Sequence, residues 1–126
     1  MTKALPIQNR VTAMTGTDYP IIQAPMGWIA RAQLASAVSN AGGMGVIETA
    51  SGEFDNIRNE VAKMRDLTDK PFGINVALSY VKGTDILDFV IQQNITFVTT
   101  SSGIPNVCTQ VFKAALTTAY HVLPTL

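Results

Sequence analysis

Tyr-Pro-Ile-Ile-Gln-Ala-Pro-Met-Gly, residues 19–27, is the stretch of sequence that decides the predicted fold. In this run two isoleucines lie between two prolines, which lack the amide donors that a position inside a sheet needs. The pattern predicts a short buried strand over residues 19–26 that leaves the sheet through a stiff exit.

The residues at that exit, Ala24, Pro25, Met26 and Gly27, are small, flexible or without an amide donor. A flat ligand can therefore lie against their backbone, and this is where we expect the chemistry to gather. The alternative is that the segment is only a buried strand end in which the methionine fills a gap in the core.

Length and composition indicate one small globular domain. The chain has 126 residues, of which 47% are hydrophobic and 14% charged, and its formal net charge is zero. It has no cluster of lysines and arginines, so the composition supports neither a nucleic acid nor a membrane surface as partner. A small molecule or a protein is the expected partner.

The sequence also predicts a cytoplasmic protein. It contains no signal-like apolar core near the N-terminus and no apolar run of about 18 residues, the length of a membrane span. Its single cysteine, Cys108, rules out an internal disulfide and fits a reducing compartment. Cys108 lies within a helical pattern, where packing competes with a role as nucleophile.

Strands and helices alternate along the chain. Residues 1–18 are interpreted as a lead-in that caps the bottom of the fold. Apolar spacing and breakers predict strands at 19–26, 44–49, 72–77, 95–99 and 119–123, and helices at 28–40, 53–67, 80–93 and 105–115. This alternation favours a parallel sheet covered by helices.

Two architectures fit this order, an open doubly wound sheet and part of a closed (β/α)8 barrel. A dinucleotide-binding sheet usually carries Gly-x-Gly-x-x-Gly after its first strand, and that spacing is absent here. Gly42 and Gly43 precede a strand and are predicted to be a helix cap and turn. A complete barrel needs about 250 residues, so on the barrel interpretation only the first half is present.

The carboxyl ends of parallel strands are where α/β folds place their functional groups. The amide of Asn75 both donates and accepts hydrogen bonds, which suits a ring system with carbonyl and N–H groups side by side, although it is equally suited to capping the next loop. The other polar or small residues expected at this edge are Glu48, Thr49, Thr100, Ser101, Ser102, Gly103 and His121.

These side chains alone support little chemistry. No metal-ligand cluster, nucleophile elbow or phosphate loop is found in the sequence. His121 has the chemistry of a general base, but a lone histidine in an apolar strand is more often a core residue. The shortage of reactive groups favours a bound cofactor that carries the difficult step.

Five ordered motifs resemble the nitronate monooxygenase family, also called 2-nitropropane dioxygenases, which is related to flavin-type enoyl-ACP reductases. The motifs are Tyr19-Pro-Ile-Ile-Gln-Ala-Pro-Met-Gly, Gly42-Gly-Met-Gly-Val-Ile-Glu, Lys70-Pro-Phe-Gly-Ile-Asn, Phe97-Val-Thr-Thr-Ser-Ser-Gly and Tyr120-His-Val-Leu-Pro-Thr. They span nearly the whole chain.

The resemblance implies the N-terminal part of a TIM-type (β/α)8 barrel with non-covalently bound FMN. It implies that the backbone at Ala24–Gly27 lies by the isoalloxazine ring, that Asn75 hydrogen-bonds to the flavin, and that Ser101, Ser102 and Gly103 line the same pocket. It also implies oxidation of alkyl nitronates with molecular oxygen.

Several alternatives stay open at this point. The enoyl-ACP reductase relatives pass electrons from NAD(P)H to an enoyl thioester instead. The family's later segments, with the catalytic histidine and the loops for the FMN phosphate, do not occur in residues 1–126, so no catalytic residue is assigned to His121 or to any other position. We therefore expect a truncated domain that binds FMN weakly and turns over poorly, or a non-catalytic half-barrel that associates through its open edges.

One position departs from the family pattern. Leu116 stands where a glycine is usual, between the fourth helix and the fifth strand. We expect a leucine to avoid positive φ there, which would alter or strain the turn.

Overall fold

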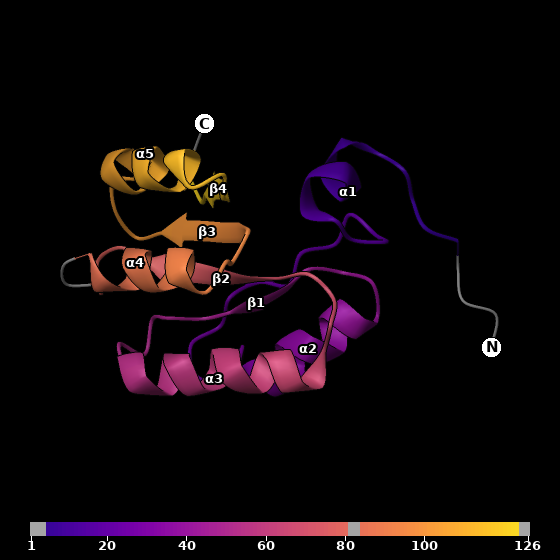
Figure 1. Ribbon diagram of the computed structural model, residues 1–126, viewed down its shortest axis with the longest axis horizontal. Coiled ribbons are helices and arrows are strands. Elements are labelled where there is room, and N and C mark those ends of the chain that lie inside the picture. Colours follow the sequence, from indigo (N-terminus) through magenta and orange to yellow (C-terminus); the bar gives the residue numbers. More distant parts are fainter. Residues whose placement is uncertain (1–4, 81–83, 124–126) are drawn as a thin grey trace.

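The computed structural model describes residues 5–80 and 84–123, which contain one parallel sheet and the helices around it (Figure 1). The strands are β1 (Gly45–Ile47), β2 (Phe72–Ala77), β3 (Phe97–Ser101) and β4 (Thr118–His121). The helices are α1 (Arg10–Thr15), α2 (Ala32–Asn40), α3 (Phe54–Leu67), α4 (Asp85–Gln92) and α5 (Asn106–Ala114).

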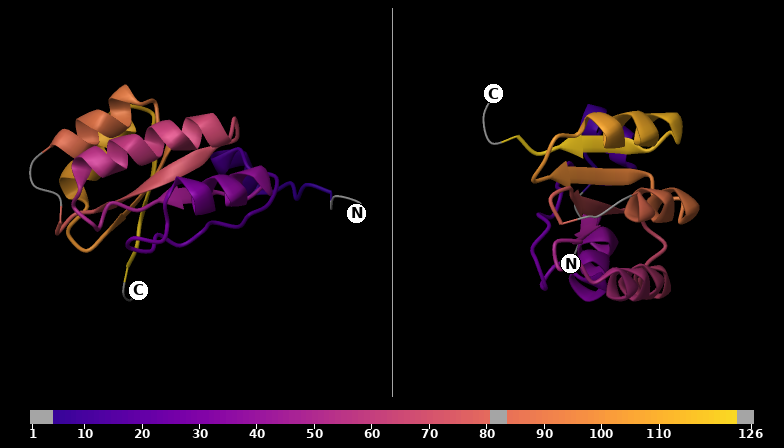
Figure 2. Two further views of the ribbon diagram at one scale, coloured as in Figure 1. Left: turned by 90° about the horizontal axis from the view of Figure 1, so that it is seen from below. Right: turned by 90° about the vertical axis from the view of Figure 1, so that its left-hand side faces the viewer.

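The strand order identifies the barrel type of winding. The strands pair in the order β1-β2-β3-β4, and every pair is parallel. A doubly wound sheet reverses its strand order and carries helices on both faces. Here the second to fifth helices pack with β1, β2 and β3 in one apolar cluster, and Figure 2 shows α3, α4 and α5 on the same side of the strands.

The two faces of the sheet are chemically different because side chains alternate along each strand. Ile47, Ile74 and Val98 face the helices in the main core. The opposite face, called the inner face below, holds a second cluster of Met44, Val46 and Phe97 with Tyr120 against it. The Phe97 and Tyr120 rings lie 5.3 Å apart between centroids.

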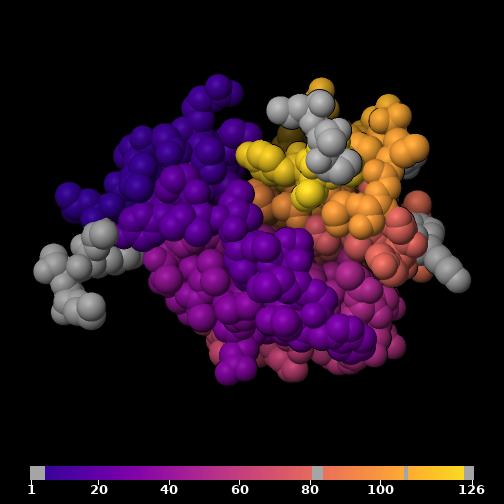
Figure 3. Space-filling model, turned by 180° about the vertical axis from the view of Figure 1, so that it is seen from behind, coloured from indigo at the N-terminus to yellow at the C-terminus, as the bar shows by residue number. Residues whose placement is uncertain are grey.

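The lead-in predicted at 1–18 is described from residue 5 onward, and it lies at the amino end of β2, where a Cβ on Gly16 would be 3.4 Å from Pro71. It contains a short helix that the sequence analysis missed. Asn9 accepts a hydrogen bond from the Thr12 amide in a capping box, and Gly16 ends α1 at φ 71°. The Tyr120 hydroxyl donates to Met14 Sδ at 3.6 Å. Figure 3 accordingly shows the indigo N-terminal segment beside the yellow end of the chain.

The predicted first strand at 19–26 is wrong as a regular buried element. Only one parallel bridge forms, between Ile22 and Met44, and Ile21 and Ile22 are 63% and 41% exposed. The Gln23 side chain then continues the pairing, donating to the Val46 carbonyl at 3.0 Å and accepting from its amide at 3.3 Å. In the described parts of the chain this segment has a pairing partner on one side only, so its isoleucines are not covered.

The other elements agree with the sequence predictions in type and differ at their ends. The predicted strand at 72–77 matches β2, and the predicted helix at 53–67 matches α3 with Glu53 as its N-cap. The helix predicted at 28–40 begins only at Ala32, because Trp28 is left-handed at φ 65° and Arg31, the N-cap, is extended at φ −108° and ψ 178°. The helix predicted at 80–93 begins at Asp85 among the described residues, and its positions 81–83 lie outside them.

Three helices end in the same Schellman turn, in which the residue after the C-cap is left-handed. These residues are Gly42 after α2 (φ 100°), Asn94 after α4 (φ 51°) and Leu116 after α5 (φ 58°). In each turn the next amide reaches back to a helix carbonyl, as from Thr117 to Phe112 at 2.9 Å. The glycine pair at 42–43 is thus a cap and turn, as predicted, whereas the expectation that Leu116 avoids positive φ is wrong.

Replacing Leu116 with glycine is expected to stabilise the protein by about 1 kcal/mol, because the left-handed conformation costs a leucine more than a glycine. The leucine side chain is 90% exposed, so its removal sacrifices little packing. Urea unfolding of Leu116→Gly measures the gain. Leu116→Ala is the control, since it removes the same side chain but keeps the strained Cβ, and an equal gain in both variants would contradict the explanation.

Candidate functional site

The candidate site lies at the carboxyl ends of the parallel strands. The register pairs Asn75 with Thr99 and Ala77 with Ser101, so the ends of β2 and β3 are level. The segment after Gln23 reaches the same edge beside β1, because Gln23 pairs with Met44 and Val46. All the loops that follow these strands therefore lie together at the carboxyl ends of the strands, and "the same edge" below means this end of the sheet.

Asn75 and Ser101 are brought together, as the sequence predicts. Asn75 is 3% exposed. Gly73 pairs with Phe97 of the inner face, so Asn75, two residues later in the strand, lies on the inner face as well. Its Oδ1 accepts a hydrogen bond from the Thr99 hydroxyl at 2.8 Å, and its Nδ2 donates to Ser101 Oγ at 3.3 Å. These bonds fix the plane and orientation of the amide before any ligand arrives.

Ser101, Ser102 and Gly103 line a hollow of about 420 Å³ with His121, Val122 and Leu123. Ser102 is left-handed at φ 56°, and its carbonyl accepts a hydrogen bond from the Ser79 hydroxyl. This bond joins the loops that follow β2 and β3 and shapes the edge of the hollow.

Ala24–Gly27 form an open stretch of backbone at the same edge. Ala24, Met26 and Gly27 are exposed, and a Cβ added to Gly27 would meet no atom within 4 Å. Within residues 5–80 and 84–123, the amides of Ala24, Met26 and Gly27 have no hydrogen-bond acceptor. The described contacts include no hydrogen bond between this stretch and Asn75 or residues 101–103, so β1 separates the two halves of the candidate site.

His121 is not placed for chemistry on the inner face. Tyr120 lies on the inner face and side chains alternate along a strand, so the side chain of the next residue, His121, lies on the helix side of β4. There its Nδ1 lies 2.8 Å from Thr100 Oγ1, a residue that is 3% exposed. His121 is half-buried and hydrogen-bonded to this hydroxyl, and it borders the hollow beside residues 101–103 without belonging to the apolar core.

Cys108 is also a packing residue. It is 8% exposed and belongs to the main apolar core through α5. Burial raises the pKa of its thiol above the ordinary value. A thiol that resists ionisation and lies inside the core is a poor nucleophile.

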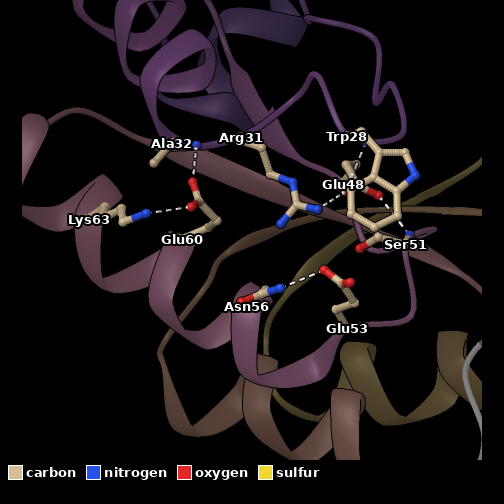
Figure 4. A network of polar contacts seen from close by, with 9 residues as sticks. All are labelled: Trp28, Arg31, Ala32, Glu48, Ser51, Glu53, Asn56, Glu60 and Lys63. Carbon is tan, nitrogen blue, oxygen red and sulfur yellow. Dashed lines mark hydrogen bonds and ion pairs between the residues drawn. The ribbon is translucent and has the colours of Figure 1, made fainter.

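The sequence analysis missed a polar network behind the open stretch (Figure 4). Glu48 is 1% exposed, and its carboxylate binds the Arg31 guanidinium at 3.1 Å, the Trp28 amide at 3.3 Å and the Ser51 amide at 3.1 Å. A charged residue at the end of an apolar strand was the available signal. Its partners lie up to 20 residues away in the chain and have no spacing that reveals them.

Glu60 fixes the start of α2 in the same region. Its carboxylate accepts from the Ala32 amide at 2.8 Å and pairs with Lys63 at 2.8 Å. Burial raises the pKa of Glu60, but the hydrogen bonds from Lys63 and Ala32 and the charges of Lys63 and Arg31 outweigh it and lower the pKa overall. Glu60 therefore stays ionised near neutral pH.

Two further findings bear on the class of site. Across the described parts of the chain, no three His, Cys, Asp or Glu side chains are grouped as a metal ion would need. No helix in those parts is long and apolar enough to cross a membrane.

Residues 8–122 match the family model described as nitronate monooxygenase. The chain belongs to this family. The Paraburkholderia phytofirmans protein named nitronate monooxygenase is 48% identical over 63 residues, which cover 50% of this chain and 17% of that protein. The "(3aS,4S,5R,7aS)-5-hydroxy-7a-methyl-1-oxo-octahydro-1H-indene-4-carboxyl-CoA dehydrogenase" of Mycobacterium tuberculosis is 33% identical over 89 residues, which cover 71% of this chain and 25% of that protein.

A solved structure of mutant FabK from Thermotoga maritima matches with a TM-score of 0.89 and 31% identity, and the match covers 94% of this chain and 40% of that one. The chain thus spans a quarter or less of these two curated relatives and 40% of the matched structure. The match confirms the fold as part of a TIM-type barrel. The nitronate monooxygenase family consists of FMN-dependent flavoproteins.

Proposed function

We propose that this chain supplies the flavin-ring side of an FMN-dependent oxidoreductase that oxidises alkyl nitronates with molecular oxygen. The observation that carries the proposal is the combination, toward the carboxyl ends of the strands, of the preorganised Asn75 amide with backbone amides at Ala24, Met26 and Gly27 that have no acceptor among the described residues. Family membership supports the reaction class.

The residues present fit the ring of FMN. An isoalloxazine ring displays carbonyl oxygens and N–H groups along one side, which need donors and acceptors in one plane. The exposed amides of residues 24–27 are donors, and an amide side chain such as Asn75 supplies both kinds of group. The open space beside Gly27 lets a flat ring approach this backbone.

The chemistry that bound FMN would supply is to accept electrons from a carbanion-like substrate and to pass them to oxygen. In our proposal the residues of this chain bind and orient the ring, and Ser101, Ser102 and Gly103 line the neighbouring hollow. His121 faces the helices, so we assign removal of a substrate proton to no residue described here.

Reduction of an enoyl thioester with NAD(P)H is the second candidate, and the match to FabK favours it. Anaerobic mixing of the flavin-loaded whole enzyme with an alkyl nitronate or with NADPH separates the two functions. Flavin bleaching by the nitronate supports our proposal, and bleaching by NADPH alone supports the second.

The open edge at Ile21 and Ile22 bears on how the site is completed. These side chains are exposed beside an unpaired stretch of backbone. We propose that further βα units of a longer protein cover this edge and close the barrel, since unpaired parallel edges favour association. Association with a second copy through this edge is the competing arrangement.

Titration of the 126-residue chain with FMN and with riboflavin tests the proposal through the flavin difference spectrum. We expect weak binding with similar affinities for both flavins, because the residues assigned here face the ring and not the phosphate. A preference for FMN of more than about tenfold would contradict this assignment. Repeating the titration at several chain concentrations detects self-association, in which case the apparent affinity rises with concentration.

A further inference from the structure

We propose that Glu48 is a positioning residue that holds the turn at Gly27–Arg31, and with it the flavin-facing stretch Ala24–Gly27, in its ligand-ready conformation. Through Arg31 it also fixes the indole of Trp28 as a wall beside that stretch. The inference rests on the proposed function for the identity of the ligand, whereas the geometry of the turn stands by itself.

The first argument is the burial of the Glu48 carboxylate. A buried charge is costly unless its oxygens are paired and hydrogen-bonded. Glu48 Oε1 contacts Arg31 and the Trp28 amide, and Oε2 contacts the Ser51 amide. The Glu48 amide donates to the Ala30 carbonyl at 3.0 Å, so one residue at the end of β1 is bonded to three residues of the turn.

The second argument is the backbone of Trp28. A φ of 65° is rare for an aromatic residue and persists only where the surroundings impose it. In this turn the Trp28 amide points at the Glu48 carboxylate. Left-handed residues enforced in this way gather at binding sites, where strain keeps a loop in one conformation.

The third argument is the position of the Arg31 guanidinium. It lies 5.4 Å from the centre of the Trp28 ring while it pairs with Glu48 (Figure 4). The indole is 65% exposed and follows Gly27, whose surroundings are open. The buried Glu48 carboxylate thus fixes the Arg31 guanidinium, and the guanidinium restrains the exposed Trp28 ring at the rim of the candidate site.

The far end of the turn has a separate anchor, which offers a matched control. The Glu60 carboxylate binds the Ala32 amide and Lys63, and it lies on α3. Glu48→Gln and Glu60→Gln are the same chemical change in one neighbourhood. Only the first removes the direct ion pair of Arg31, and it leaves one side-chain oxygen to serve both the Trp28 and Ser51 amides.

Trp28 is the single tryptophan of the sequence, so its fluorescence reports on this turn alone. We expect Glu48→Gln to increase the amplitude of fast indole motion about twofold in time-resolved anisotropy without flavin, since exposed side chains released from their partners move on the nanosecond scale. Glu60→Gln should leave the anisotropy decay unchanged. We also expect the dissociation constant for FMN to rise about tenfold in Glu48→Gln and less than about twofold in Glu60→Gln.

Arg31→Lys keeps the positive charge but loses the planar group over the indole, and it serves if Glu48→Gln does not fold. Wild-type anisotropy in both Glu48→Gln and Arg31→Lys would overturn the inference, as would equal effects of Glu48→Gln and Glu60→Gln. A wild-type chain that binds neither FMN nor riboflavin would count against the proposed function. The anisotropy data would then decide separately whether Glu48 holds the turn.

Discussion

Replacing Gly45 with alanine is expected to lower the free energy of unfolding by about 3 kcal/mol, the upper end of the range for overpacking a core. A Cβ at this position would lie 2.0 Å from the Ala35 carbonyl oxygen and 2.8 Å from Ser39 Oγ. The close approach of α2 to β1 depends on the missing side chain. Backbone atoms block the methyl group, so a rotamer change cannot relieve the contact.

The unfolding midpoint in urea measures the loss, and Gly27→Ala is the matched control. Nothing lies within 4 Å of a Cβ at Gly27, and its change should stay within about 0.5 kcal/mol. A Gly45→Ala protein as stable as Gly27→Ala would show that α2 does not pack against β1 as described.

Replacing Asn75 with alanine is expected to weaken flavin binding about tenfold, the value of one lost hydrogen bond to a ligand. The structure already holds the amide through Thr99 and Ser101, so the wild-type side chain needs no ordering when the ligand binds. Difference spectra with FMN measure the loss. Asn59→Ala, the same change on the exposed surface of α3, should bind as the wild type does.

Stability must be checked beside affinity, because Asn75→Ala also leaves the buried Thr99 hydroxyl without its acceptor. Flavin binding equal to that of the wild type in a folded Asn75→Ala protein would remove Asn75 from the site. Lost binding together with an unfolded chain would not support the role either, and Asn75→Asp, which keeps an acceptor for Thr99, then gives the decisive affinity.

The elements predicted well from the sequence are those with local signals. The Lys70-Pro71 break and the apolar run after it locate β2 to the residue. Asn94 ends its helix as predicted, because a left-handed asparagine is a local preference. The alternation of strands and helices also predicted the parallel sheet, because each strand and each helix is recognised from residues that are adjacent in the sequence.

The errors concern features that depend on distant partners. The apolar run at Ile21 and Ile22 predicts a buried strand, but burial requires neighbours on both sides, and among the described residues the run pairs only with the segment at Met44. Trp28 lies in a helical pattern, yet a carboxylate 20 residues away holds it in a left-handed turn. At Leu116 the cause of the error is local instead. The Schellman turn after α5 requires a left-handed residue, and this requirement overrides the preference of leucine for negative φ.

The candidate site likewise contains residues that the sequence predicts and residues that only the structure reveals. The ordered motifs led to Asn75 and Ser101, which the structure joins by a hydrogen bond. Residues 24–27 reach the same edge, but their contact with a shared ligand stays a prediction. Glu48 ends one of the quoted motifs, but no spacing in the sequence links it to Arg31 and Trp28, so only the folded chain reveals their network.

The most direct test of the central claim, that this sheet edge holds a flavin ring, is the difference spectrum of FMN titrated with the purified chain. We expect a saturable shift of the flavin bands that riboflavin reproduces and that Asn75→Ala weakens. A flavin spectrum that stays identical to that of free FMN at every chain concentration would contradict the claim.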